Sequence, residues 1–258
     1  MIIRFLGAHN EESSTTGLSS VLIDDILAID AGSLASRLSF AEQEKIKAIL
    51  LSHGHYDHIR DIPAFAFSNS QRLTRVLATE KTLEILISHL LDGLIYPRFA
   101  GTDSFLKRPA IEPCRLEVLR PQEIEGYRVL PLPMNHPLET IGFSITAPDG
   151  KNILYFNDTG PGLHEVWRQI DSRPQLLIID TTYPNRLEQF AWDAGHLCPK
   201  MLTGELDAFD KCKGYLPQVV LMHLSPRYED EIREEVSQTA TELGITIRMA
   251  REGDLIII

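Results

Sequence analysis

The stretch Ser52-His53-Gly54-His55-Tyr56-Asp57-His58 decides the fold and the chemistry that we expect of this chain. It follows Ala48 to Leu51, a short apolar run typical of a buried strand, and a helix is expected after it. Three imidazoles and one carboxylate thus lie within six residues at a strand end, where loops of α/β proteins build sites. Neutral imidazole is the commonest metal ligand. We therefore interpret the stretch as a metal-binding loop rather than a solvated polar turn.

Three further candidate ligands, His136, Asp158 and His223, lie far from this stretch in the sequence but in the same kind of place. Each comes shortly after an apolar run typical of a strand; these runs are 129–132, 154–156 and 219–222. A lone histidine or aspartate there is usually a turn residue. Together with the first stretch, however, these positions favour one shared site at the strand ends.

Short apolar runs alternate with helical stretches along the chain, as in layered α/β proteins. Strands are expected over 2–7, 18–23, 26–29, 48–51, 129–132, 141–145, 153–156, 176–179, 219–222 and parts of 245–258. Helices are expected over 79–95 and 229–243, and a surface loop or lid over 98–113. We find no internal repeat and no linker, so a single domain over 1–258 is expected.

The pattern HxHxDH, followed by a distant His, Asp and His in this order, resembles the metallo-β-lactamase superfamily over nearly the whole chain. The resemblance implies an αββα sandwich, that is, two mixed sheets flanked by helices. It also implies that one metal ion is held by His53, His55 and His136, that a second is held by Asp57, His58 and His223, and that Asp158 bridges both. Asp30-Ala31-Gly32 is similar to an early Asp-x-Gly element of the family.

Two divalent metal ions are therefore the expected cofactors. Imidazole and carboxylate ligands suit zinc best, with manganese and iron as alternatives. A dinuclear zinc site makes a hydroxide nucleophile near neutral pH, and such a nucleophile serves lactams, thioesters, lactones and phosphodiesters alike. The fold by itself does not choose among these substrates.

Two later segments resemble class II cyclic-nucleotide phosphodiesterases. Ala194-Gly195-His196-Leu197-Cys198-Pro199-Lys200 looks like a GHLS-type segment, and Leu221-Met222-His223-Leu224-Ser225-Pro226 looks like a THxxP-type segment. That family writes HxHLDHxxG, whereas this chain has Tyr56 and Asp61 at the Leu and Gly positions. The resemblance, which extends to the ribonuclease Z branch, implies that His196 contacts the phosphate or protonates the leaving oxygen. Asp57 and His196 are thus the catalytic candidates.

Some polar and aromatic residues near these segments have two interpretations. Asp180 ends a buried strand and is either a support for the metal ligands or a turn residue. Tyr56 either lines the pocket or packs under the metal loop. His9, His89 and His164 are assigned to a loop or to helix surfaces, without a catalytic role.

Composition narrows the cellular setting and the partners. The 258 residues are 43% hydrophobic and 24% charged, with no apolar run near the roughly 18–20 residues of a membrane span and no signal peptide visible. Three widely spaced cysteines predict no disulfide framework, so a reducing cytoplasm is expected. The net charge of −11 makes a long nucleic acid an unfavourable partner. No membrane partner is expected, and the sequence leaves a homodimer open.

The leading hypothesis is a metal-dependent phosphodiesterase that cleaves a small, cyclic nucleotide-like phosphodiester with a hydroxide bridging the two metals. One alternative is a ribonuclease Z-like endonuclease that processes the 3′ end of transfer RNA. Another is a thioester or lactone hydrolase of the same fold. The non-enzyme alternative is a metal-stabilised binding or sensing module.

Overall fold

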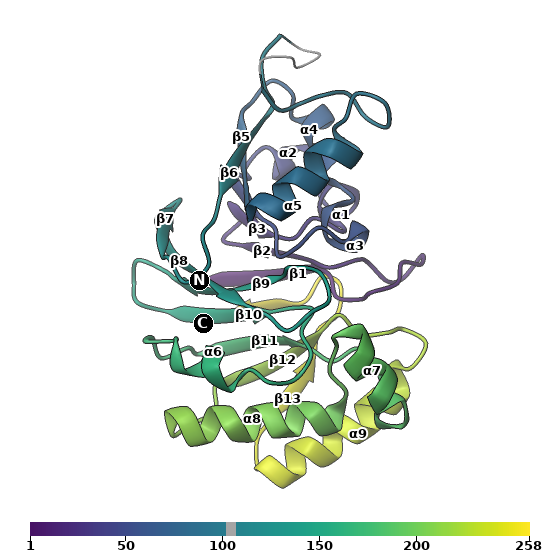
Figure 1. The fold of residues 1–258 in the computed structure, drawn as a ribbon, viewed down its shortest axis with the longest axis vertical. Helices are drawn as coiled ribbons and strands as arrows, with labels where there is room; N and C mark the ends of the chain where they lie inside the picture. The colour runs from purple at the N-terminus through teal and green to yellow at the C-terminus, as the bar shows by residue number, and fades with distance from the viewer. Residues whose placement is uncertain (102–106) are drawn as a thin grey trace.

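Two mixed seven-stranded sheets face each other in the computed structural model, which describes residues 1–101 and 107–258 (Figure 1). In spatial order the first sheet contains β14 (Leu255–Ile257), β1 (Ile2–Gly7), β2 (Ser20–Ile23), β3 (Leu27–Ile29), β4 (Ala48–Leu50), β5 (Thr74–Ala78) and β6 (Ile111–Arg115). The second contains β13 (Ile247–Met249), β12 (Gln218–Met222), β11 (Leu176–Asp180), β10 (Asn152–Phe156), β9 (Ile141–Thr146), β8 (Tyr127–Pro133) and β7 (Gln122–Ile124).

Helices cover the outer face of each sheet (Figure 1). Over the first sheet lie α1 (Leu34–Arg37), α2 (Phe40–Gln43), α3 (Tyr56–Ile59), α4 (Ile62–Ser68), α5 (Glu80–Ile85) and the π-helical turn η1 (Leu86–Leu90). The helices on the side of the second sheet are α6 (His164–Arg168), η2 (Asn185–Leu187), α7 (Glu188–Ala194), α8 (Pro199–Lys213) and α9 (Glu229–Leu243). The expected sandwich of two mixed sheets flanked by helices is therefore confirmed.

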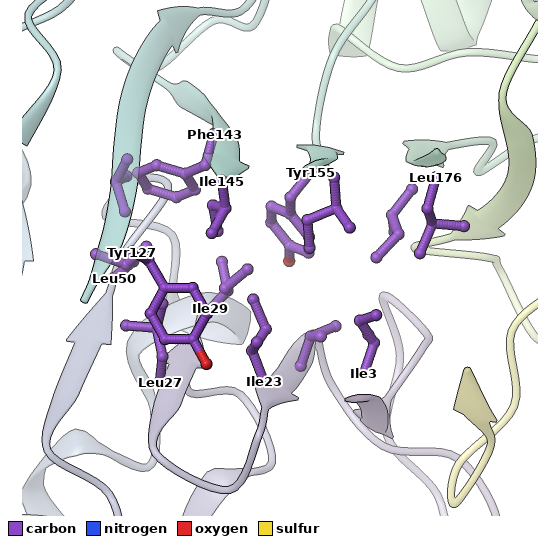
Figure 2. Close-up of a cluster of buried hydrophobic side chains, with 14 of the residues drawn as sticks. Ile3, Ile23, Leu27, Ile29, Leu50, Tyr127, Phe143, Ile145, Tyr155 and Leu176 are labelled. Carbon is purple, nitrogen blue, oxygen red and sulfur yellow. The ribbon is translucent and has the colours of Figure 1, made fainter. Parts of the chain in front are cut away.

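Three apolar layers hold the sandwich together: one between the two sheets and one between each sheet and its helices. Figure 2 shows the middle layer, in which Ile23 and Ile29 of the first sheet face Phe143 and Ile145 of the second. Strands β11 and β12 are buried on both faces almost throughout, as their continuous apolar runs predict for central parallel strands.

The strand directions bring the candidate residues to one edge. In the first sheet β3 and β4 pair in parallel, and in the second β10, β11 and β12 do so. Asp180 is the last residue of β11, and the residues that follow the carboxyl ends of the other four strands are Asp30, His53, Asp158 and His223. Parallel strands deliver their ends to the same edge of a sheet, which is where α/β proteins bind ligands.

The structure corrects the helix expected over 79–95. Helix α5 begins at Glu80, continues as the π turn η1 and ends at Leu90. Beyond it Asp92 accepts hydrogen bonds from the backbone of Leu94 (2.7 Å) and Ile95 (2.9 Å), and Gly93 adopts φ +88°. The apolar periodicity continues through 94, but Asp92-Gly93 forms a turn that ends the helix.

Other elements also begin or end at residues different from those expected from the sequence. The loop expected over 98–113 ends at Ala110, because β6 begins at Ile111 and places Pro113 in an edge strand, where its missing N–H is tolerated. Residues 102–106 of that loop lie outside the described ranges. The strand expected from Leu18 starts at Ser20, and the residues over 245–258 form two strands that join different sheets.

No helix within 1–101 and 107–258 is long and apolar enough to cross a membrane.

Candidate metal centre

The structure brings all seven predicted ligands together, in two groups that share Asp158. One group consists of His53, His55, His136 and Asp158, and the other of Asp57, His58, Asp158 and His223. Within each group one potential ligand atom per residue lies within 4.8 Å of all the others. This division is the one that the family resemblance implies.

The first group converges on the Nδ1 atom of His55. That atom lies 2.9 Å from Nε2 of His53 and 3.3 Å from Nε2 of His136. Oδ2 of Asp158 faces the same point, 3.6 Å from Nε2 of His53 and 4.0 Å from Nε2 of His136. The short spacer Gly54 fits here because a Cβ atom at this position would lie 2.7 Å from Cδ1 of Ile85.

The second group is equally tight. Nε2 of His58 lies 3.3 Å from Oδ2 of Asp57 and 3.2 Å from Oδ1 of Asp158. Nε2 of His223 lies 3.1 Å and 3.2 Å from the same two oxygens. The two oxygens of Asp158 therefore face different groups, as a bridging carboxylate requires.

Two buried atoms of the second group indicate that a cation fits. Nε2 of His58 and Oδ1 of Asp158 have no hydrogen-bond partner within the described residues, although both are shielded from water. A buried polar atom without a partner costs free energy unless an ion or water satisfies it. Imidazole nitrogen and carboxylate oxygen are the donors that zinc accepts. The residues present thus fit the expected metal ions.

Neighbouring groups fix which nitrogen three of the ligand histidines offer. Nδ1 of His136 donates to the carbonyl of Gly195 (3.0 Å), which can only accept. Nδ1 of His58 donates to Asp30 (2.9 Å), and Nδ1 of His223 lies 3.0 Å from the hydroxyl of Thr182. Because Nδ1 carries the proton, Nε2 keeps the lone pair that a metal needs.

Asp30 does more than the early Asp-x-Gly resemblance indicates. Besides His58 it accepts from the backbone N–H of Ser52 (2.8 Å) and from the hydroxyls of Ser52 (2.9 Å) and Tyr155 (2.8 Å). The fully buried carboxylate thereby positions the start of the metal loop. Its place directly after a strand was the only signal of this role in the sequence, and Thr182 and the Gly195 carbonyl gave none.

The surroundings of the ligands shift their pKa values in the directions that metal binding needs. Burial, reinforced by neighbouring imidazoles, lowers the pKa of His53 well below its ordinary value, and burial also lowers the pKa of His55 and His136. These three rings stay neutral, as ligands must be. Burial would raise the pKa of Asp158, but His223 and His58 outweigh it and hold that pKa well below the usual range.

His196 lies beside both groups without belonging to either. Its ring stacks on His223 at 5.1 Å between centroids and meets His136 edge to face at 5.2 Å. Its Nδ1 lies 2.6 Å from Oδ2 of Asp180. Burial lowers the pKa of His196, but the Asp180 carboxylate more than compensates and raises it to about 9. Nε2 is the nitrogen left for a substrate.

Asp180 supports the centre and caps no helix. Its Oδ1 accepts from the hydroxyl of Thr182 (3.0 Å) and from the backbone N–H of Leu197 (3.3 Å). Thr182 in turn contacts His223, so Asp180 orients the catalytic candidate His196 directly and the metal ligand His223 through one hydroxyl.

Tyr56 is 62% exposed and therefore does not pack under the metal loop. His9 lies in the loop after β1, as expected, and is buried there, with its Nδ1 2.7 Å from Glu252.

Comparison with known proteins agrees with this geometry. Residues 20–224 match the family described as Beta-lactamase superfamily domain. The chain is 27% identical to a ribonuclease Z of Bradyrhizobium sp. (strain ORS 278), over 92% of this chain and 90% of that protein. It is 22% identical to a 3′,5′-cyclic-nucleotide phosphodiesterase of Schizosaccharomyces pombe, over 77% of this chain and 61% of that one. The crystal structure of unliganded yeast PDE1 superposes with a TM-score of 0.85 at 15% identity, covering 100% of this chain and 99% of that one, and so shares its fold.

Proposed function

The chain belongs to the β-lactamase superfamily, and on that premise we propose that it is a metal-dependent phosphodiesterase acting on a small, cyclic nucleotide-like phosphodiester. The seven ligands His53, His55, Asp57, His58, His136, Asp158 and His223 would hold two divalent ions, most simply zinc. When bound, such ions supply Lewis acidity and an activated water.

The observation that carries the proposal is the Asp180–His196 pair beside the ligand groups. Thioester hydrolysis expels a thiolate, which is a good leaving group, whereas cleavage of an unactivated phosphodiester requires a proton for a poor alkoxide leaving group. The Asp180 carboxylate beside His196 stabilises the protonated imidazole, which can supply that proton. Asp180 holds Nδ1, so the Nε2–H of His196 is directed to the substrate side.

Two roles are open to that N–H. It donates a hydrogen bond to a non-bridging phosphoryl oxygen, which stabilises the charge that develops there. Alternatively it transfers its proton to the leaving oxygen as the phosphorus–oxygen bond breaks. Asp180 supports either role by orienting the ring and stabilising its protonated form.

A ribonuclease Z-like activity on transfer RNA is the second candidate. The 27% identity to a ribonuclease Z over nearly the whole chain favours it. The net charge of −11 opposes it, because affinity for a phosphate backbone grows with the number of cationic contacts. A small phosphodiester carries one charge and needs few such contacts.

Replacing His196 tests the proposal. We expect His196→Ala to reduce turnover of 3′,5′-cyclic AMP by roughly 10²–10⁴-fold, because an alkoxide leaves poorly without a proton. Cleavage of bis-p-nitrophenyl phosphate should fall far less under the general-acid role, since nitrophenolate is a good leaving group. An equal fall on both substrates would instead support phosphate binding.

Metal content and thermal stability are measured in parallel, so that loss of metal is not mistaken for loss of proton transfer. His164→Ala is the matched control, because His164 is an exposed histidine whose side chain is 66% accessible. Parental rates of His196→Ala on both substrates would contradict the proposal. A parent enzyme that cleaves transfer RNA precursors but no cyclic nucleotide would favour the second candidate.

A further inference from the structure

The loop between β1 and β2, residues 8–19, runs beside the second ligand group. Leu224, next to the ligand His223, donates its N–H to the carbonyl of Ala8 (3.1 Å) and accepts from Asn10 (3.3 Å). At the other end of the loop Ser19 accepts from Asn157, the neighbour of Asp158, at 2.9 Å. In Figure 1 this purple loop projects from the edge of the two sheets. The loop is thus fixed to the neighbours of two metal ligands.

Two arginines closely follow ligands of this group in the sequence, and the loop supplies a carboxylate to each. Arg60 follows the ligand His58 by two residues, and Glu12 forms an ion pair with its Nη1 atom. Arg227 follows the ligand His223 by four residues, and its Nε lies 2.7 Å from Oε2 of Glu11. Arg60 also contacts Asp61 at 3.1 Å. Both cations nearest these ligands in sequence are therefore neutralised by one acidic dipeptide.

Stability is a weak reason for the Arg227–Glu11 pair. The Arg227–Glu11 pair is exposed, with 73% and 39% of the two side chains accessible, and water screens such pairs so that they stabilise a fold little. Their effect on the local field is larger, since an unpaired arginine binds phosphate with several donors. Glu11 also acts on the wall of the site. Burial, then the charges of Asp180 and Glu11, raises the pKa of Tyr183, whose ring lies 5.9 Å from that of His196.

We propose that Glu11 and Glu12 are specificity-determining residues that keep Arg227 and Arg60 from binding a phosphate chain. The metal centre would then accept a single small phosphodiester and reject polyanions such as RNA. The proposal rests on the proposed function, because it explains how a phosphodiester site on this fold excludes long nucleic acids. It assigns to the loop a role in substrate choice that is separate from catalysis.

The test removes both carboxylates. Binding of a labelled single-stranded RNA of about 20 nucleotides is measured by fluorescence anisotropy over a salt series, for the parent and for Glu11→Gln/Glu12→Gln. We expect the double variant to bind RNA more tightly at low salt. We also expect the log–log slope of affinity against salt to steepen by roughly 0.7 for each arginine that gains a phosphate contact.

A matched control carries the same change in net charge. Glu165→Gln/Asp207→Asn also removes two carboxylates, which pair with Arg168 and Lys211 in the exposed parts of α6 and α8. This control should bind RNA as the parent does. Adding Arg227→Gln to the double variant should reverse the part of the gain that comes from Arg227.

An equal gain in the control variant would overturn the proposal, since net charge alone would then explain the binding. An RNA affinity that stays unchanged in Glu11→Gln/Glu12→Gln would also overturn the proposal, provided that this variant melts at the same temperature as the parent. If it does not, the single variant Glu11→Gln is used in its place. Because RNA binding is read without turnover, a parent inactive on cyclic nucleotides would refute the proposed function while the role of the loop is still decided.

Discussion

At the scale of single residues, three residues around the metal centre adopt a left-handed backbone conformation that L-residues rarely take. Asp30, Asp158 and His223 have φ values of 57°, 53° and 61°. A non-glycine residue in this region costs of order 1–3 kcal/mol, and the surrounding structure must compensate for it. Here each residue turns the chain just after a strand so that its side chain faces the centre. The same conformation also occurs in turns such as that at Glu125, but at these three positions it directs a side chain to the centre.

Asp158 is the single side chain assigned to both groups, so it gives the sharpest prediction about metal content. We expect Asp158→Asn to lose bound metal from both groups, because a neutral amide binds transition ions poorly and offers one oxygen instead of two. Metal analysis of protein purified without chelator should show close to two ions per chain in the parent and fewer than one in the variant. The exposed Asp149 provides the control Asp149→Asn. Two tightly bound ions in Asp158→Asn would refute the bridging role.

At the scale of elements, the two sheets repeat one strand order that is not visible in the sequence. In each, an antiparallel meander (β1–β3 or β8–β10) is followed by three parallel strands (β4–β6 or β11–β13). Asp30 and Asp158 follow the third strand of their respective meanders and share the left-handed conformation. The centre is therefore built from equivalent positions of two halves, and β14 returns to the first sheet to close the chain.

Gly195, which ends α7, ties an element boundary to a metal ligand. Its φ is +74°, its carbonyl accepts from His136, and a Cβ atom there would lie 2.4 Å from Cδ of Pro137 and 2.9 Å from Nδ1 of His136. We expect Gly195→Ala to lower the melting temperature and to weaken metal binding, because His136 must move. Thermal unfolding and metal analysis measure the two effects.

Gly214 is the matched control, since it ends α8 with nearly the same φ of +75°, but a Cβ atom at this position would meet nothing within 4 Å. Gly214→Ala should cost about 1 kcal/mol through backbone strain alone and leave metal content unchanged. Equal effects of the two substitutions would show that the contact with His136 is unimportant.

At the scale of the whole molecule, side chains cross between distant parts of the chain to hold the centre. Tyr155 of the second sheet donates to Asp30 of the first, and Asp30 holds His58, so a contact between the sheets supports this ligand. Figure 2 shows the Tyr155 ring between the sheets. Near the C-terminus Glu252 accepts from the backbone of Ala8 (3.2 Å) and Gly17 (2.7 Å), which closes the base of the β1–β2 loop.

The buried pair of His9 and Glu252 predicts how stability depends on pH. Burial lowers the pKa of His9, but Glu252 outweighs it and raises that pKa above 6.5. A raised histidine pKa stabilises the fold fully below the unfolded value and loses this contribution as pH rises through the folded value. The pKa of Glu252 is lowered from 4.5, since His9 and Gly17 outweigh burial, so its contribution is lost only as pH falls through the folded value.

The variant His9→Asn keeps a donor for Glu252 but removes the charge. We therefore expect its loss in free energy of unfolding, relative to the parent, to be larger near pH 5.5 than near pH 9. Urea unfolding at both pH values measures the difference, and His164→Asn, at an exposed histidine, is the control. A loss of the same size at both pH values would show that His9 is not charged in the folded protein.

The sequence by itself predicted the elements whose signal is local. The runs at 176–179 and 219–222 predicted strands, and helix 229–243 has the predicted bounds. The ligand motif was also local, because metal loops place their ligands within a few residues of one strand end. Where turn chemistry competes with apolar periodicity, as at Asp92-Gly93, the predicted end of helix 79–95 was wrong.

Only the tertiary structure decided which groups support the ligands. Asp30 and Tyr155 are 125 residues apart, and Glu12 meets Arg60 across 48 positions. Such contacts follow from how two sheets dock and how a loop crosses their edge, and no short-range pattern encodes them. The chain thus specifies its ligands through spacing, while their tautomers, their charges and the neutralised arginines beside them arise from packing between segments that are distant in sequence.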